Sequence, residues 1–215
     1  MSDKVLDLSL YLVLDPVLTQ KFGMVKTAEL AVQGGATVVQ LRAPQWKKRK
    51  RYECALELKK VLDSYRVPLI IDDDIDVALA VNADGVHVGQ KDLPPDVTRR
   101  LMGKGKIVGL SVNNEEQMRL VDSDTVDYVG IGPIFSTKTK TDAEPAFGLE
   151  GLARLAQLSP VPAVAIGGIK ASHIEAISET SVQGIAIVSA VCGQEDPQKS
   201  ARLLSDLWHQ HHRVN

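Results

Sequence analysis

The chain has 215 residues, enough to bury one core, and its 44% hydrophobic and 24% charged residues exclude wholesale disorder. A formal net charge of −2 gives no electrostatic case for nucleic acid or membrane as the main partner. The apolar run near the N-terminus is interrupted by Asp7 and Asp15, so we expect neither a signal peptide nor a membrane span. The two cysteines lack metal-binding spacing, and we expect both to be reduced in a cytoplasmic protein.

Short runs rich in Val, Ile and Leu alternate with longer amphipathic segments along the chain. The predicted strands are residues 8–14, 37–42, 68–72, 85–89, 106–111, 126–131, 163–167 and 184–189. The predicted helices are residues 24–33, 47–64, 75–81, 95–102, 114–121, 149–158, 172–179 and 197–211, with Asn113 as a candidate N-cap. Nearly all-apolar strands separated by helices indicate a parallel sheet covered by helices. Eight such units in so short a chain predict a (β/α)₈ TIM barrel, with residues 1–215 as a single domain.

Chemistry in such barrels gathers at the C-terminal ends of the strands, so the polar residues there are candidates for the site. Asp72, Asp73 and Asp74 follow one another at the end of the third strand, and Asp92 arrives from the next loop. Carboxylates this close repel each other unless a cation compensates, which favours a hard divalent ion such as Mg²⁺. Alternatively, Asp72 or Asp74 caps the third helix and the other carboxylates are solvated.

Two further strand ends suit anions. After the sixth strand, Thr137, Thr139 and Lys140 form either a clamp for a phosphorylated ligand or a solvated loop. Gly168, together with the turn after the last strand, matches the phosphate site common in these barrels, although a plain tight turn is the alternative. Two anion sites in one cleft suggest an enzyme that joins or splits two phosphorylated small molecules.

The sequence resembles the thiamine-phosphate synthase family over nearly its whole length. The matching segments are QLR (40–42), PLIIDDDIDVALAV (68–81), ADGVHVGQKDLP (83–94), GLSV (109–112), DYVGIGPIFSTKTK (127–140), AIGGI (165–169) and GIAIVSA (184–190), in family order. The resemblance implies a transferase that joins hydroxymethylpyrimidine pyrophosphate to thiazole phosphate, releasing pyrophosphate and forming thiamine phosphate. The family is thought to ionise the pyrimidine to a carbocation before the thiazole nitrogen attacks.

The resemblance also assigns roles to residues. Asp73 and Asp92 would bind Mg²⁺, while Arg42, Thr139 and Lys140 would neutralise the leaving pyrophosphate. Asp72 would be a further substrate-binding residue. Gln40 and Ser111 would hold the pyrimidine, Thr137 would contact the thiazole, and the backbone of Gly168, Val188 and Ser189 would bind the thiazole phosphate. Arg42, Ser111 and Lys140 are the expected catalytic residues.

Two positions depart from the family pattern. A lysine expected two residues after Arg42 is replaced by Pro44, and the usual Asn before the metal-binding aspartate is here Asp72. Losing a cation and gaining an anion should weaken pyrophosphate binding unless Lys47 or Lys48 folds back over the anion; a solvated basic helix start is the alternative.

Other readings remain open. A thiazole tautomerase-like isomerase, or a non-catalytic paralogue that binds thiazole phosphate or thiamine phosphate, would share much of this pattern. RNA binding by the basic run at residues 47–51 is a third alternative. His87 is either a core histidine or a proton shuttle at the barrel mouth. We expect small-molecule substrates, no nucleic acid and no membrane, and a homo-oligomer is one option for assembly.

Overall fold

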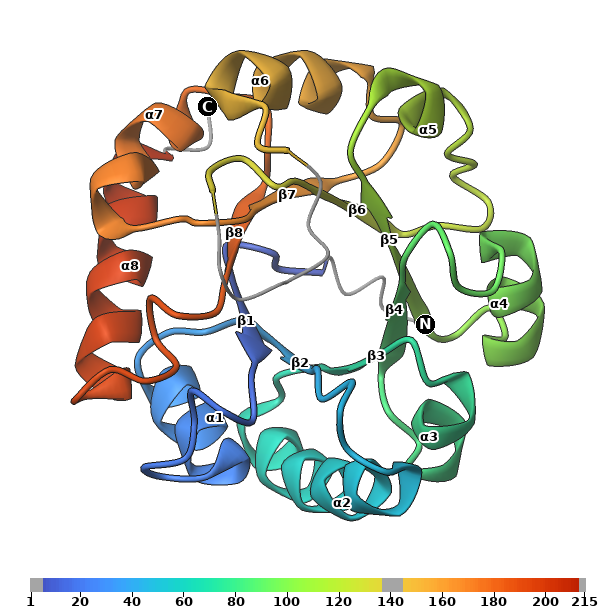
Figure 1. The fold of residues 1–215 in the computed structure, drawn as a ribbon, viewed down its shortest axis with the longest axis vertical. Coiled ribbons are helices and arrows are strands. Elements are labelled where there is room, and N and C mark those ends of the chain that lie inside the picture. The colour runs from blue at the N-terminus through green and yellow to red at the C-terminus, as the bar shows by residue number, and fades with distance from the viewer. Residues whose placement is uncertain (1–5, 137–144, 213–215) are drawn as a thin grey trace.

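The computed structural model describes residues 6–136 and 145–212, and its eight parallel strands close into a barrel. The strands follow one another in chain order around the ring, and β8 (Gly184–Ile187) pairs with β1 (Leu10–Leu14) to complete it. Figure 1 looks into the barrel and shows the helices forming an outer ring around the strands. The TIM barrel predicted from the sequence is confirmed.

Each strand is followed by its helix. The remaining strands are β2 (Val38–Leu41), β3 (Leu69–Asp72), β4 (Gly85–Val88), β5 (Ile107–Val112), β6 (Tyr128–Ile131) and β7 (Ala163–Ile166). The helices are α1 (Met24–Gln33), α2 (Lys48–Tyr65), α3 (Ile75–Ala80), α4 (Pro95–Met102), α5 (Glu115–Arg119), α6 (Gly148–Leu158), the 3₁₀ helix Ala171–His173, α7 (Ile174–Ser178) and α8 (Pro197–His211). Among the described residues, no helix is long and apolar enough to cross a membrane.

The core has two parts because successive side chains on a strand point to opposite faces of the sheet. In β1, Leu10, Leu12 and Leu14 pack with helix residues in the larger cluster, between the barrel and its helices. Tyr11 and Val13 belong instead to the smaller cluster, which fills the barrel interior with residues from six strands. The interior is therefore a packed core, and only its C-terminal end is available for a site.

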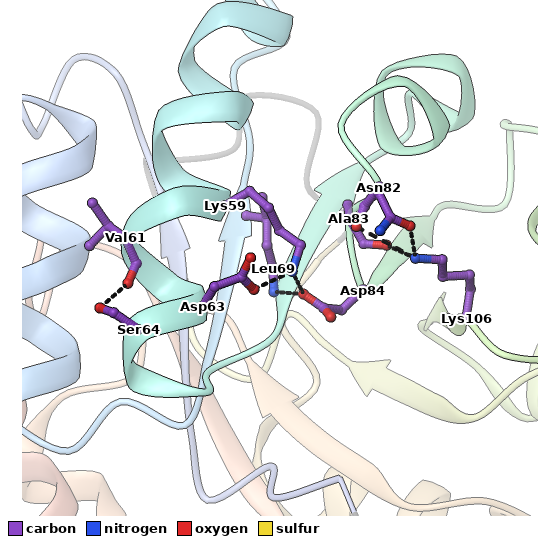
Figure 2. A network of polar contacts seen from close by, with 9 residues as sticks. All are labelled: Lys59, Val61, Asp63, Ser64, Leu69, Asn82, Ala83, Asp84 and Lys106. Carbon is purple, nitrogen blue, oxygen red and sulfur yellow. Dashed lines mark hydrogen bonds and ion pairs between the residues drawn. The ribbon is translucent and has the colours of Figure 1, made fainter.

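The N-terminal end of the barrel is held together by a polar network between strand starts (Figure 2). The Asp84 carboxylate accepts a 2.9 Å hydrogen bond from the Leu69 backbone N–H and lies 3.3 Å from the Lys59 Nζ. Lys106 Nζ donates to the Asn82 Oδ1 over 2.6 Å. These contacts tie α2, β3, β4 and β5 together on the face away from the predicted site, where polar residues serve stability.

Candidate active site

The carboxyl groups of Asp73 and Asp92 meet beyond the ends of β3 and β4. Asp73 directly follows β3 with a φ of +59°, and its N–H donates to the His87 carbonyl over 2.9 Å. Asp92 accepts a 2.7 Å hydrogen bond from the Gly89 N–H, and its carboxyl group lies close enough to that of Asp73 to raise the Asp73 pKa. Burial first, then the charge of Asp72 and the contact with Asp92, raises the pKa of Asp73 to about 8.

Arg42 lies beside this acidic pair. Its Nε is 3.4 Å from the Asp72 Oδ2, and both side chains are largely buried at the ends of β2 and β3. The guanidinium partly offsets the negative charges and lowers the pKa of Asp73. Asp72 therefore pairs with the guanidinium group that the family resemblance assigns to pyrophosphate.

The third carboxylate of the run, Asp74, belongs to the packing of the outer helices. It is the N-cap residue of α3, but its side chain makes no capping hydrogen bond. It lies instead 2.8 Å from the Arg51 Nη1 and 3.6 Å from the Lys48 Nζ, both on α2. Asp74 therefore occupies the predicted N-cap position, but its carboxylate pairs with α2 and makes no capping hydrogen bond.

Lys48 belongs to the same interface between α2 and α3. Its Nζ is 2.7 Å from the Asp76 Oδ2, so this ammonium group faces α3. Lys47, the exposed N-cap residue of α2, is the remaining candidate to replace the lysine lost at Pro44.

A chain of hydrogen bonds crosses the barrel interior. Gln40 Nε2 donates to the Tyr11 hydroxyl over 2.9 Å, and the Tyr11 and Tyr128 hydroxyls are 2.7 Å apart. The Tyr128 hydroxyl is 2.9 Å from the His87 Nδ1, whose Nε2 is in turn 2.9 Å from the Ser111 Oγ. Gln40 and Ser111, which the sequence assigns to the pyrimidine, are thus the two ends of one continuous chain.

A glycine on β5 makes room for this chain, whereas the glycine on β6 would tolerate a Cβ at ordinary contact distance. A Cβ at Gly109 of β5 would lie 2.2 Å from the Tyr128 Cζ and 2.5 Å from the His87 Nδ1. A Cβ at Gly130 of β6 would lie 3.4 Å from the His87 Cε1. The sequence pattern marks these glycines only as strand residues, yet position 109 cannot carry a side chain beside these two rings.

The ends of β7 and β8 come together at the other side of the barrel mouth. Gly168 has a φ of +64°, and a Cβ there would lie 2.7 Å from the Ser136 carbonyl oxygen. The Val188 carbonyl accepts the N–H of Cys192 over 2.8 Å and so begins the turn after β8. Neither the Gly168 nor the Ser189 N–H donates to a backbone carbonyl within the described residues. Backbone N–H groups not used by other backbone groups at two adjacent strand ends are compatible with the predicted anion site.

The remaining predicted site residues, Thr137, Thr139 and Lys140, lie outside the described residues. The structure describes the loop after β6 up to Ser136, where it is tied to the loop after β7 by a 3.1 Å hydrogen bond from the Phe135 N–H to the Gly167 carbonyl. This loop therefore leaves β6 alongside the Gly168 turn.

Comparison with known proteins identifies the family. The family model described as thiamine monophosphate synthase matches residues 10–191, most of the barrel. The chain belongs to the thiamine monophosphate synthase family.

Individual family members are similar to this chain over almost their entire length. The thiamine-phosphate synthase of Laribacter hongkongensis is 48% identical over 202 residues, which cover 94% of this chain and 95% of that protein. The thiamine-phosphate synthase of Clostridium tetani is 40% identical over 210 residues, covering 98% of this chain and 100% of that protein.

Solved structures agree with the fold. A thiamine phosphate pyrophosphorylase from Pyrococcus furiosus superposes with a TM-score of 0.86 at 34% identity, over 95% of this chain and 97% of that one. A 3-hexulose-6-phosphate synthase from Salmonella typhimurium has a TM-score of 0.70 at 18% identity, over 95% of this chain and 100% of that one, a likeness of fold alone.

Within this thiamine monophosphate synthase family member, sequence reasoning missed the two buried tyrosines. Tyr11 and Tyr128 are 1% and 0% exposed and interrupt otherwise aliphatic strands. A buried tyrosine hydroxyl requires a hydrogen-bond partner, so these two residues were a signal of a polar interior. His87, left open between core and mouth, is a partly buried member of the same chain.

Proposed function

We propose that this chain is a thiamine-phosphate synthase, a transferase that joins hydroxymethylpyrimidine pyrophosphate to thiazole phosphate and releases pyrophosphate. Family membership supports the reaction. The observation that supports the assignment within the site is the closeness of Asp73 and Asp92, where burial and the neighbouring carboxylates raise the pKa of Asp73 beside Arg42. Such a pair is poised to exchange a proton for a cation.

The donor set fits Mg²⁺. Within the described residues, no group of three or more His, Cys, Asp or Glu side chains is arranged to hold a metal ion. Mg²⁺ commonly takes only one or two protein carboxylates and completes its octahedron with waters and substrate phosphates, so Asp73 and Asp92 would suffice to hold it. The bound ion would supply positive charge to the pyrophosphate.

The protein's own cations complete the binding of the leaving group. Arg42 would bind pyrophosphate oxygens as Asp72 is displaced from it, and Thr139 and Lys140 would supply a hydroxyl and an ammonium group from the loop after β6. Pyrophosphate departure needs concentrated positive charge in a site from which water is excluded, and it needs no side-chain nucleophile.

The two organic substrates would sit above different strands. Gln40 and Ser111 would orient the pyrimidine as its bond to pyrophosphate breaks. Thr137 would contact the thiazole, and the backbone at Gly168, Val188 and Ser189 would hold the thiazole phosphate. Fixing both reactants in one cleft turns the attack of the thiazole nitrogen into an effectively unimolecular step.

The proposal includes the setting of the enzyme. It would act on small molecules in the cytoplasm, and its assembly, with a homo-oligomer as one option, can be measured by light scattering. No membrane or nucleic-acid partner enters this function.

A turnover experiment tests the reaction. The purified chain is given both phosphorylated substrates, with and without Mg²⁺, and thiamine phosphate is measured. Metal-dependent product is expected. No product while thiazole phosphate still binds would support a binding paralogue, and rearrangement of the thiazole alone would support the tautomerase reading.

A further inference from the structure

We propose that Tyr11, Tyr128 and His87 are positioning residues that fix which groups of the pyrimidine site donate and which accept hydrogen bonds. The proposal rests on the proposed function, since it concerns the groups at Gln40 and Ser111. The main evidence for the proposal is the unbroken chain of hydrogen bonds that joins these two side chains through the barrel interior.

The direction of the chain follows from its first link. Gln40 donates to the Tyr11 hydroxyl, so the Tyr11 proton is left to donate to Tyr128. The Tyr128 proton then goes to the His87 Nδ1, which must be the unprotonated ring nitrogen. With Nδ1 as the acceptor, the Nε2 atom carries the ring proton and donates it to the Ser111 Oγ.

The two ends of the hydrogen-bond chain then have opposite roles toward a ligand, one as acceptor and one as donor. Gln40 directs one N–H of its amide to Tyr11, and its carbonyl oxygen, on the other arm of the amide, remains an acceptor. Ser111, whose oxygen accepts from His87, retains its own proton as a donor. An acceptor at one end of the chain and a donor at the other suit an aminopyrimidine, whose exocyclic amine donates and whose ring nitrogens accept. A 4-oxo-pyrimidine presents the reverse pattern and would set its carbonyl against that of Gln40.

The chain resists reversal because its members are buried and coupled. Gln40, Tyr11 and Tyr128 are at most 4% exposed, so water cannot replace a lost partner. Turning the Gln40 amide over would require every proton along the chain to change sides together. Gly109 holds the Tyr128 and His87 rings at their present distance, because neither ring can shift toward β5 without meeting its backbone.

Selectivity between two neutral ligands tests this directly. Calorimetry compares a 5-hydroxymethyl-4-aminopyrimidine with its 4-oxo counterpart, for the wild type and for Tyr128→Phe. The wild type should prefer the amine. Tyr128→Phe should lower that preference about tenfold, the value of one hydrogen bond, because Tyr11 can then donate to a turned Gln40 amide. If these residues had a purely structural role, Tyr128→Phe would weaken the binding of both ligands equally. The ratio of the two affinities would then be unchanged, and this result would overturn the proposal.

Matched variants separate the two ends of the chain. Tyr11→Phe removes the partner of Gln40 but leaves the bond between Tyr128 and His87, so selectivity should fall while the His87 tautomer persists. Tyr65→Phe removes a hydroxyl that contacts Gln33 on the outer surface and should change neither.

Nitrogen NMR on the wild type reports the state of the His87 ring directly. The His87 ring, assigned by its loss in His87→Asn, should show a protonated Nε2 and a bare Nδ1. A protonated Nδ1 would reverse the chain and overturn the proposal. Both measurements use binding and spectroscopy alone, so an absence of thiamine phosphate in the turnover assay would count against the proposed function while leaving this test readable.

Discussion

The carboxyl groups of Asp73 and Asp92 lie close together, although one follows β3 and the other lies in the turn after β4. Two carboxyl groups can approach this closely only when a proton or a cation lies between them. We therefore expect Mg²⁺ to raise the thermal melting temperature of the wild type but not that of Asp73→Asn. The exposed Asp76, paired with Lys48, provides the control, because Asp76→Asn should leave the Mg²⁺ effect intact. An equal Mg²⁺ effect in Asp73→Asn would remove these residues from the metal site.

The same pair predicts how stability depends on pH in the absence of metal. The pKa of Asp73 is raised from 3.8 to about 8, so the folded chain holds this proton more tightly than the unfolded chain does. This contribution to the free energy of unfolding is complete below about pH 4 and is lost as the pH rises toward 8. Thermal melts in EDTA should show a decline for the wild type and a smaller one for Asp73→Asn. Parallel curves for the two proteins would contradict the assignment.

Asp72 is predicted to restrain the enzyme. It pairs with Arg42 and adds a negative charge beside Asp73, whose pKa it raises. Asp72→Asn should free the guanidinium and lower the KM for the pyrophosphate substrate roughly threefold to tenfold, as expected for removing one nearby like charge. Steady-state kinetics measure this, with the KM for thiazole phosphate as the internal control. A higher KM for the pyrophosphate substrate would show that the carboxylate itself binds substrate.

The basic start of α2 gives a comparison between neighbouring lysines. Lys48 is paired with Asp76 and half-exposed, so Lys48→Ala should leave the KM for the pyrophosphate substrate unchanged and cost at most about 1 kcal/mol of stability. Lys47→Ala should raise this KM if Lys47 replaces the lysine missing at Pro44. Unchanged KM values for both variants would mean that Pro44 is not compensated from this helix.

Asp84 at the opposite end of the barrel should matter for stability alone. Asp84→Ala leaves the buried Leu69 N–H without its acceptor and Lys59 without this partner. Such losses typically cost about 1–3 kcal/mol, which urea denaturation can measure. The kcat of the folded protein should stay the same. A fall in kcat at full folding would mean that the two ends of the barrel are coupled.

Much of the fold could be predicted because the alternation of apolar runs and helices is long and regular. The helices at 24–33, 95–102 and 197–211 begin and end where the sequence predicts them. The helix predicted at 114–121 is shorter, Glu115–Arg119, and Asn114 rather than Asn113 caps it by accepting from the Gln117 N–H. Two adjacent asparagines suit the position equally, and only backbone geometry decides between them.

The site could be predicted in outline for a topological reason. All parallel strands end at the same face, so Gln40, Arg42, Asp73, Asp92 and Ser111 had to come near one another. The contacts that join residues far apart in the chain carry no local signal. Tyr11 meets Tyr128 across the barrel, and Lys48 meets Asp76 across two helices. Such pairings depend on how strands and helices are placed around the ring, which periodicity alone does not specify.

The bare backbone of Gly109 has a consequence for how this enzyme can change. An alanine there would collide with both Tyr128 and His87, while shrinking either ring would leave a hole beside the glycine. Single substitutions at these positions should therefore be disfavoured in either direction, and a new interior becomes reachable only when they change together. A search for altered pyrimidine specificity in this barrel should vary positions 109, 128 and 87 as one combinatorial unit, since one-at-a-time scanning would reject each partner before its complement arrived.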